Sequence, residues 1–408
     1  MRCILCHLSA WGCGHSRTLT TPDGSPPMRT ILAESADLLP AILDSDLCNE
    51  STAIFCPSSD TPTGIGETIV APCTGSLGAP GDEMVVGDVF VVKVQEYILT
   101  PYLEIDGPTF ARITSEKDFY AFLDHADQAK QHGVFPPALL HPMMRLGDLC
   151  ALGGAHTCGG PGQRLFVRAS GEASTTPQGM PLGFVTDGLA SLTSAWSAIR
   201  RPPGSGCPGC LTGAVRTPTL RIAHQQRPWL SRYLCTLDAL RTAATEGLTN
   251  LKVSGFPHRM TAAADQYTQA VDLTLVGAEL PVLLFNTAIA LIHDPHSNQQ
   301  FQVGTGTARL LELLMIYGDE DAAIAAATHH LGLAPHAARE ALAQVMSGLS
   351  DFGMQLLPEK RCRSASSIQP GHQGAAAQGV NTSCWLSAMG AADSRHSWQP
   401  VPGPRASG

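Results

Sequence analysis

The sequence predicts an α+β fold, in which a central α+β region precedes a C-terminal winged-helix-like module with a three-stranded sheet and three helices. Two observations support this prediction. From residue 84 onward, short runs of β-branched and aromatic residues alternate with segments of helical apolar spacing. Between residues 280 and 357 the apolar spacing changes once, from the period of strands to that of helices.

The chain of 408 residues is long enough for two or three domains, and we expect four regions along it. Residues 1–83 mix short apolar runs with turn-rich stretches, which predicts a poorly ordered or irregular region. Residues 84–260 should form the central region, whose role the sequence does not define, and residues 273–357 the module. Residues 358–408 are rich in Gly, Ala, Ser and Gln, which predicts a disordered tail. Met28 is a second candidate for the translation start, which would leave the residues before it without a role in the fold.

In the central region, residues 89–92 and 97–105 are rich in β-branched and aromatic residues, which predicts two strands. Ser115 and Asp118 have the spacing of a capping box, and the helical pattern that follows should end at Gly133. We expect further strands at 165–167 and 182–185, and further helices at 189–196 and 228–244.

The module should begin with a tight hairpin, because residues 281–285 and 288–292 are apolar runs separated by Asn-Thr. A turn at 294–298 should lead to a third strand, which alternates polar and apolar residues and so should expose one face to solvent. This third strand comprises Gln299, Gln300, Phe301, Gln302 and Val303.

Three helices should follow these strands. The first should end at Gly318, and the second should run from Asp319, where acidic residues suit the positive end of a helix, to Gly332. The third should start after Pro335 and bury one continuous stripe against the core. This stripe consists of Ala338, Leu342, Val345, Leu349 and Phe352.

A resemblance to a known family rests on residues 289–333, which read IALIHDPHSNQQFQVGTGTARLLELLMIYGDEDAAIAAATHHLGL. This segment resembles the PqqD-like recognition element of pathways that make ribosomally synthesised and post-translationally modified peptides (RiPPs). In that family a strand ending in Asp-Pro leads through a turn and a short strand to a helix with the pattern TA..LL.LL, and then to an alanine-rich helix. The resemblance covers residues 280–357.

Three earlier segments extend the resemblance back to about Met84. They read YILTPYLEIDGPTFARI (97–113), DFYAFLDHADQAK (118–130) and GVFPPALLHPMMRLGDLCALGG (133–154). Together they are similar to the longer recognition proteins of daptide-type RiPP biosynthesis.

The resemblance implies a protein that is not an enzyme. Members of the family hold the leader of a precursor peptide as an added strand on the edge of the third strand, against the third helix, and present the rest to modifying enzymes. Backbone hydrogen bonds then give affinity, and pockets beside alternate side chains give specificity. The edge here would be Gln299 to Val303, and the helix face would offer Arg339, Ala343, Met346 and Ser350. Met346 would supply an adaptable apolar contact, and Arg339 would pair with a leader carboxylate.

Charge and composition argue against several other classes of protein. The formal charge of −9, with few basic residues in the module, is the wrong balance for a nucleic-acid partner. No stretch of about 20 apolar residues is free of interruption, so we expect no membrane partner. The 13 cysteines have no regular spacing and no secretory signal precedes them, so we expect free thiols and a cytoplasmic protein.

We expect no metal and no other cofactor, with a zinc site at Cys207 and Cys210 as the alternative. These two residues form a C-x2-C pair in a Pro/Gly-rich loop, which can supply half of a zinc site. A closed structural site needs four ligands, so Cys235, His224 or the pair His156 and Cys158 would have to complete the set.

Two other functions are compatible with the sequence. One is a zinc- or thiol-dependent cytoplasmic enzyme built on residues 84–260, although no GxSxG, HExxH or P-loop motif occurs. The other is a winged-helix nucleic-acid binder. The basic residues between Arg200 and Arg259, opposed by Asp238 and Glu246 alone, predict either a solvated face or a docking surface for an acidic peptide segment or a partner enzyme.

Overall fold

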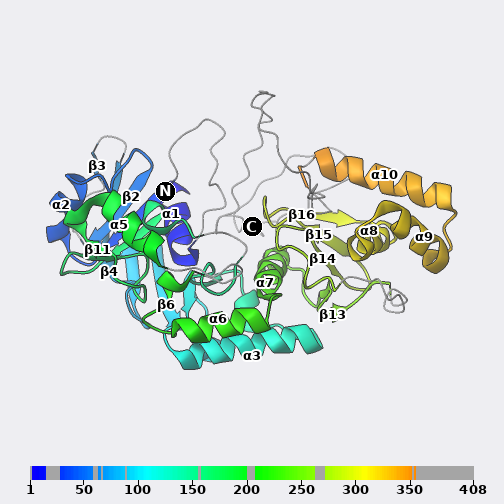
Figure 1. Ribbon diagram of the computed structural model, residues 1–408, viewed down its shortest axis with the longest axis horizontal. Helices are drawn as coiled ribbons and strands as arrows, with labels where there is room; N and C mark the ends of the chain where they lie inside the picture. The colour runs from blue at the N-terminus through cyan, green and yellow to red at the C-terminus, as the bar shows by residue number, and fades with distance from the viewer. Residues whose placement is uncertain are drawn as a thin grey trace, which may run out of the picture.

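The computed structural model confirms a mixed α+β architecture with two sheets, one of eleven strands and one of five (Figure 1). None of the described helices is long and apolar enough to cross a membrane. The tail that we expected to be disordered, residues 358–408, lies outside the described residues. The structure describes residues 2–14, 28–57, 63–65, 68–87, 90–154, 158–199, 207–261, 272–351 and 353–354.

The large sheet has ten strands in one row, in the order β11-β10-β9-β1-β2-β4-β5-β6-β7-β8, and β3 pairs with β4 beside that row. The β9-β1-β2-β4 and β6-β7-β8 pairs are parallel, whereas β5 pairs antiparallel with both β4 and β6. The strands are β1 (Arg29–Ala33), β2 (Thr52–Pro57), β3 (Thr63–Ile65), β4 (Thr68–Gly75), β5 (Glu83–Val86), β6 (Phe90–Glu96), β7 (Thr109–Arg112), β8 (Met144–Leu146), β9 (Arg164–Val167), β10 (Glu172–Ser174) and β11 (Gly183–Phe184).

Helices cover both faces of this sheet. Helix α1 (Arg2–Cys13) contributes Leu8 and Trp11 to the core on one face. Helices α2 (Leu39–Leu43) and α5 (Gly188–Ala198) contribute Ile42 and Leu192 to the core on the other face. The indole Nε1 of Trp11 donates a hydrogen bond to the carbonyl oxygen of Leu165 in β9 at 3.0 Å, so α1 is tied to the sheet.

The expectation of an irregular region over residues 1–83 does not hold for the described residues. They form α1, α2, the 3-10 helix η1 (Ala36–Leu38) and the strands β1 to β4, and the segment before Met28 packs into the core through α1. Every residue of β1 is buried, as are most residues of β2. Strands covered on both faces show continuous apolar runs in place of alternation, which is why their sequence pattern is weak.

The central helices follow the expected start and stop signals. Helix α3 (Glu116–His132) begins after Ser115, whose hydroxyl accepts a hydrogen bond from the Asp118 amide at 3.2 Å, and it ends at Gly133 with a φ of 68°. Besides α5, this region also contains α4 (Pro137–Leu140), α6 (Thr217–Gln226), α7 (Leu230–Thr245), η3 (Gly160–Gly162), η4 (Val185–Asp187) and η5 (Pro208–Cys210).

The strand predicted at 97–105 was wrong, because its first residues form the 3-10 helix η2 (Tyr97–Tyr102). Pro101 cannot donate to a ladder of hydrogen bonds. The Asp118 carboxylate of α3 accepts a hydrogen bond from the Ile98 amide at 3.1 Å, which fixes the turn against the helix.

The five-stranded sheet has the order β13-β12-β14-β15-β16. Its last three strands confirm the predicted hairpin and third strand, and all are antiparallel to their neighbours. Two strands upstream of residue 273 also join this sheet, so it extends beyond the expected start of the module. The bounds are β12 (Lys252–Ser254), β13 (Pro257–His258), β14 (Val282–Phe285), β15 (Ala290–His293) and β16 (Gln300–Val303).

Three helices follow β16 in the predicted order: α8 (Thr305–Tyr317), α9 (Glu320–Leu331) and α10 (Pro335–Asp351). Gly318 and Gly332 are left-handed and end α8 and α9. Asp319 caps α9 by accepting a hydrogen bond from the Ala322 amide at 3.0 Å. The predicted stripe on α10 is buried from Ala338 to Leu349, and Phe352 lies outside the described residues.

Both faces of the five-stranded sheet are buried. Val282 and Leu284 of β14 belong to a core shared with α3 and α7, whereas Leu283 and Phe285 belong to the core formed with α8, α9 and α10. Arg232 of α7, fully buried, donates to the backbone carbonyls that lead into β14. The five-stranded sheet therefore packs against the central helices with one face and against the C-terminal helices with the other.

The side chain of Glu312, on α8, is fully buried and ties these helices to the chain around β13. Its carboxyl group accepts hydrogen bonds from the Ser254 hydroxyl and from the amides of Met260 and Thr261. A buried acceptor with three donors stabilises the fold mainly because the donors would otherwise be buried without partners.

We predict that Glu312→Ala lowers the free energy of unfolding by about 3 kcal/mol, because three donors, of which those of Ser254 and Thr261 are buried, lose their acceptor. Glu340→Ala is the matched control, since Glu340 is exposed on α10, and it should change stability by about 0.5 kcal/mol or less. Urea unfolding followed by circular dichroism measures both. If the two variants are equally stable, the hydrogen bonds to Glu312 do not stabilise the fold in this way.

Candidate functional site

The β16 strand forms one edge of the five-stranded sheet. It pairs with β15 on one side, and no described strand pairs with its other side. The predicted third strand began at Gln299, whereas β16 begins one residue later, at Gln300. Its residues include no charged side chain, proline or glycine, the features by which edge strands are commonly blocked.

The register determines which backbone groups of β16 point outward. The Asp294 amide donates to the Gln299 carbonyl at 2.9 Å, and residues directly opposite in an antiparallel ladder alternate between bonded and non-bonded pairs. Phe301 and Val303 therefore bond to β15, as pairs with Ile292 and Ala290. The amides and carbonyls of Gln300 and Gln302 point away from β15, toward the free edge.

The expectation that one face of this strand is exposed to solvent is wrong at Gln300. Its side chain is 8% exposed, and its Nε2 donates to the carbonyl oxygen of Ala239 in α7 at 2.6 Å. In the described part of the chain, the Oε1 atom of Gln300 has no hydrogen-bond partner. Gln302 lies on the same face and is exposed, so α7 covers only the first half of this face.

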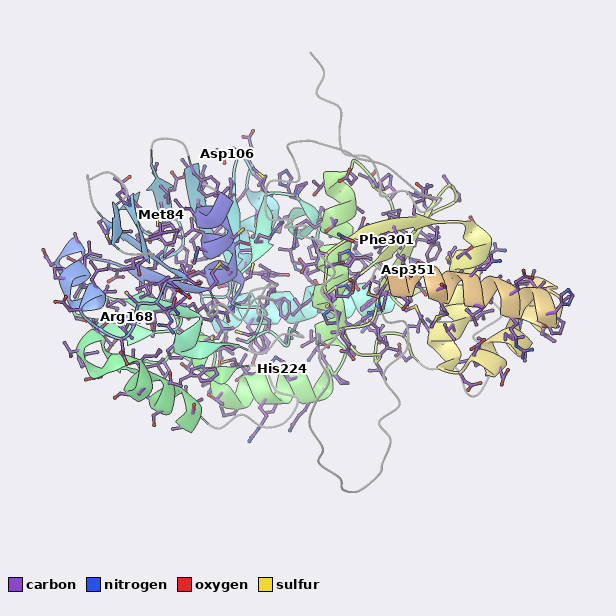
Figure 2. The ribbon with its side chains drawn as sticks, turned by 90° about the horizontal axis from the view of Figure 1, so that it is seen from above. Met84, Asp106, Arg168, His224, Phe301 and Asp351 are labelled. Carbon is purple, nitrogen blue, oxygen red and sulfur yellow. The ribbon has the colours of Figure 1, made fainter. Side chains whose placement is uncertain are left out.

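The C-terminal end of α10 lies beside β16, as the labels of Phe301 and Asp351 in Figure 2 and the ribbons in Figure 1 show. Of the helix residues predicted for the site, Ala343 and Ser350 are exposed and Met346 is half-buried against the core. The edge of β16 is thus bordered by α7 on one face of the sheet and by the end of α10 on the other.

Arg339 does not lie at this end of α10. It is eleven residues before Ser350, which at a rise of about 1.5 Å per residue corresponds to roughly 16 Å along the helix. Its Nη2 lies 3.0 Å from the Asp321 carboxylate of α9, in an exposed ion pair. Arg339 is therefore separated from the other predicted contacts, and its charge is already balanced by a neighbour.

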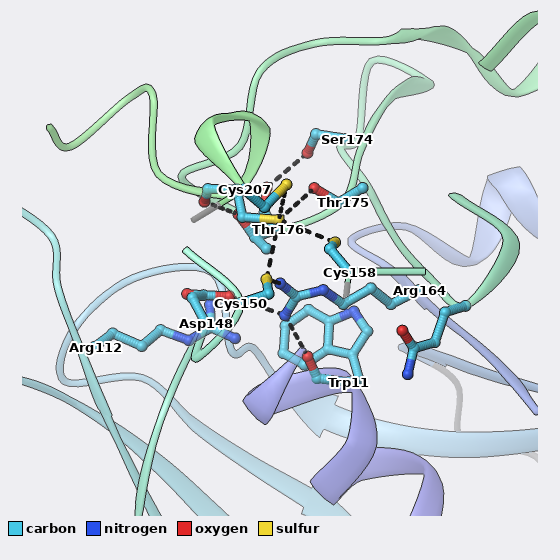
Figure 3. A network of polar contacts seen from close by, with 12 residues as sticks. Trp11, Arg112, Asp148, Cys150, Cys158, Arg164, Ser174, Thr175, Thr176 and Cys207 are labelled. Carbon is cyan, nitrogen blue, oxygen red and sulfur yellow. Dashed lines mark hydrogen bonds and ion pairs between the residues drawn. The ribbon is translucent and has the colours of Figure 1, made fainter. Parts of the chain in front are cut away.

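A second cluster of functional groups lies between the large sheet and the central helices. Four buried cysteine sulfurs meet there, all within 4.8 Å of one another (Figure 3). The Sγ of Cys210 lies 3.7 Å from that of Cys150, 3.6 Å from that of Cys158 and 3.6 Å from that of Cys207. We call these four residues the cysteine cluster.

The predicted C-x2-C pair is therefore present, but the residues expected to complete it were only partly right. Cys158 belongs to the cluster, and Cys150, which was not among the predicted ligands, is the fourth member. His156 lies outside the described residues. Cys235 bonds to the carbonyl oxygen of Ala278 at 3.3 Å, away from the cluster. His224 is buried outside it, and burial lowers the pKa of its imidazole to about 4.

Buried charges surround the cysteine cluster. The Arg164 guanidinium donates to the Asp148 carboxylate at 2.9 Å and to the Sγ of Cys150 at 3.5 Å. Burial lowers the pKa of Arg164, but negative charge on Cys210 and Asp148 outweighs this effect and raises that pKa well above its usual value. Arg112, also buried, lies over the Trp11 ring with its Cζ 4.7 Å from the ring centroid.

Several of the basic residues between Arg200 and Arg259 are engaged within the fold. Arg216 pairs with Glu116 at 2.8 Å, and Arg227 pairs with Asp127 at 2.6 Å. Because these charges are balanced by carboxylates of α3, the basic surface available for docking is smaller than the sequence suggested.

In comparisons with known proteins, no family model, no curated protein and no solved structure matches this chain.

We predict that Asp148→Asn destabilises the protein by about 3 kcal/mol, because it removes the carboxylate that pairs with the buried Arg164. Asp148 has a φ of 54°, a conformation that asparagine also tolerates, so the variant changes charge without new backbone strain. Asp106→Asn, which removes the charge of an exposed carboxylate paired with Lys93, is the control and should change stability much less, because exposed ion pairs contribute little. Thermal and urea unfolding compare the two variants, and a similar loss in both would disprove a special role for the buried pair.

Proposed function

We propose that this protein is a non-catalytic recognition protein that binds the leader of a ribosomally synthesised precursor peptide and presents it to modifying enzymes. The leader adds as a strand to the edge of β16, and the last helices together with β14 to β16 act as a winged-helix-like recognition module. The observation that supports this proposal most directly is the unpaired, unblocked edge of β16 among the described residues.

Strand addition matches the chemistry of this edge. The amides and carbonyls of Gln300 and Gln302 point outward, and backbone groups in this arrangement bind extended peptides with little regard to sequence. Specificity would come from side chains of the peptide that reach the end of α10, where Met346 supplies an adaptable apolar contact and Ser350 leaves room.

A nucleic-acid partner is the weaker alternative for the same module. Arg309 and Arg339 are exposed, but Arg339 is paired with Asp321, and the acidic Glu340 and Asp351 are exposed on the same helix. Phosphate binding requires a surplus of positive charge, which this surface lacks.

The decisive variant is Gln302→Pro, tested in the full-length chain because the sheet shares a core with α3 and α7. Proline removes only the amide that points to the free edge, so the ladder with β15 is preserved. We expect leader affinity to fall about tenfold to a hundredfold, equivalent to roughly 1–3 kcal/mol. Fluorescence anisotropy with a labelled synthetic leader measures the affinity.

Gln302→Ala is the matched control, because it shortens the same exposed side chain and keeps the amide. It should bind the leader within about twofold of the wild type, and circular dichroism should show that both variants fold. Gln302→Pro with wild-type affinity would mean that the peptide binds elsewhere.

We also expect Arg339→Glu to weaken an acidic leader less than Gln302→Pro does, because Arg339 lies far from β16 and is paired with Asp321. Its effect should decrease further at high salt, since exposed charges are screened. Anisotropy titrations at low and high ionic strength test this, and a loss larger than that of Gln302→Pro would move the binding site toward α9.

A further inference from the structure

The cysteine cluster has the geometry of a metal site and not that of a disulfide. Bonded sulfurs lie about 2.05 Å apart, whereas the sulfurs here lie 3.6–3.7 Å from Cys210. A tetrahedral zinc ion with Zn–S bonds of about 2.3 Å places its sulfurs about 3.8 Å apart. Clusters of several irons distribute their thiolates over different metal atoms, which calls for wider spacing.

The buried charged side chains around the cysteine cluster are a second, independent observation in favour of a metal site. Arg112 and Arg164 are both buried around this site, and Asp148 is the only carboxylate that pairs with either of them among the described residues. Two guanidiniums and one carboxylate leave one positive charge without compensation in the interior, which is costly. Four thiolates on one Zn²⁺ carry a net charge of −2, which offsets this positive charge and brings the total for the buried group to −1.

Polar groups next to the cysteine cluster lie within hydrogen-bonding distance of its sulfurs. The Nη2 of Arg164 lies 3.5 Å from the Sγ of Cys150, and the Thr175 hydroxyl lies 3.3 Å from the Sγ of Cys210. The Cys207 amide donates to the carbonyl oxygen of Cys150 at 2.8 Å, which holds two of the ligand segments together. Donors to coordinated sulfur of this kind are typical of zinc sites.

We propose that the cysteine cluster binds one zinc ion as a closed structural site. All four side chains are at most 6% exposed, and four thiolates leave no open position for a substrate or water, so the zinc does not act in catalysis. The ion joins the chain after β8, the chain before β9, and η5. The chain between Cys158 and Cys207 contains β9 to β11 and α5, so the metal fixes that edge of the large sheet to the central helices.

The test uses full-length protein purified without added metal or chelator. We expect about one zinc per chain by elemental analysis, and a melting temperature lowered on the order of 10 °C when a strong chelator removes the metal. Titration of the metal-free chain with Co²⁺ should give the intense absorption of tetrahedral cobalt thiolate. Absence of zinc together with failure to bind Co²⁺ would overturn the proposal, as would iron in a coloured protein.

The variant Cys210→Ser removes the sulfur that lies 3.6–3.7 Å from each of the other three, and it should lose most of the zinc. Cys235→Ser is the matched control, because Cys235 lies outside the cluster and serine can still donate to the Ala278 carbonyl oxygen. It should keep the full zinc content. If Cys210→Ser does not fold, the Co²⁺ titration of the wild type decides. Full zinc content in Cys210→Ser, or a disulfide among these four residues by thiol counting, would contradict the site.

Discussion

The rest of the structure depends on the burial of both faces of the five-stranded sheet. Val282 and Leu284 contact the core formed with α3 and α7, and Leu283 contacts the core formed with the last three helices. A sheet covered on both faces can bind a partner only along its edges. At the β13 edge the end of α3 packs closely, since a Cβ atom at Gly133 would lie 2.7 Å from the carbonyl oxygen of Phe256. Among the described residues, the β16 edge is therefore the more open edge of this sheet.

Local signals predicted several helix ends and the C-terminal hairpin well. The helix stops at Gly318 and Gly332, the cap at Ser115 and the hairpin all involve contacts close in sequence, and the structure confirms them. The large sheet could not be predicted in the same way. Its strand β1 pairs in parallel with β9, from a distant part of the chain, and its buried strands lack alternation. The strand predicted at 97–105 was wrong because Pro101 cannot donate to a strand ladder and because the hydrogen bond from Ile98 to Asp118 holds this segment as a turn against α3.

The candidate sites were predictable in part. Alternation placed the third strand of the module correctly, but the burial of Gln300 depends on α7, which the sequence does not connect to this strand. The separation of Arg339 from β16 follows from the direction in which α10 runs, which periodicity does not define. For the cysteine cluster, the C-x2-C pair was visible in the sequence, whereas Cys150 and Cys158 reach it only through the folding of the large sheet.

Residue-resolved amide hydrogen exchange tests most directly the proposed pairing of a leader with the free edge of β16. At saturating leader concentration, the amides of Gln300 and Gln302 should become protected, because they would then donate to the added strand. The amides of Phe301 and Val303, already bonded to β15, should change little. Leader binding without new protection at Gln300 and Gln302, or with equal protection along the whole strand, would contradict strand addition at this edge.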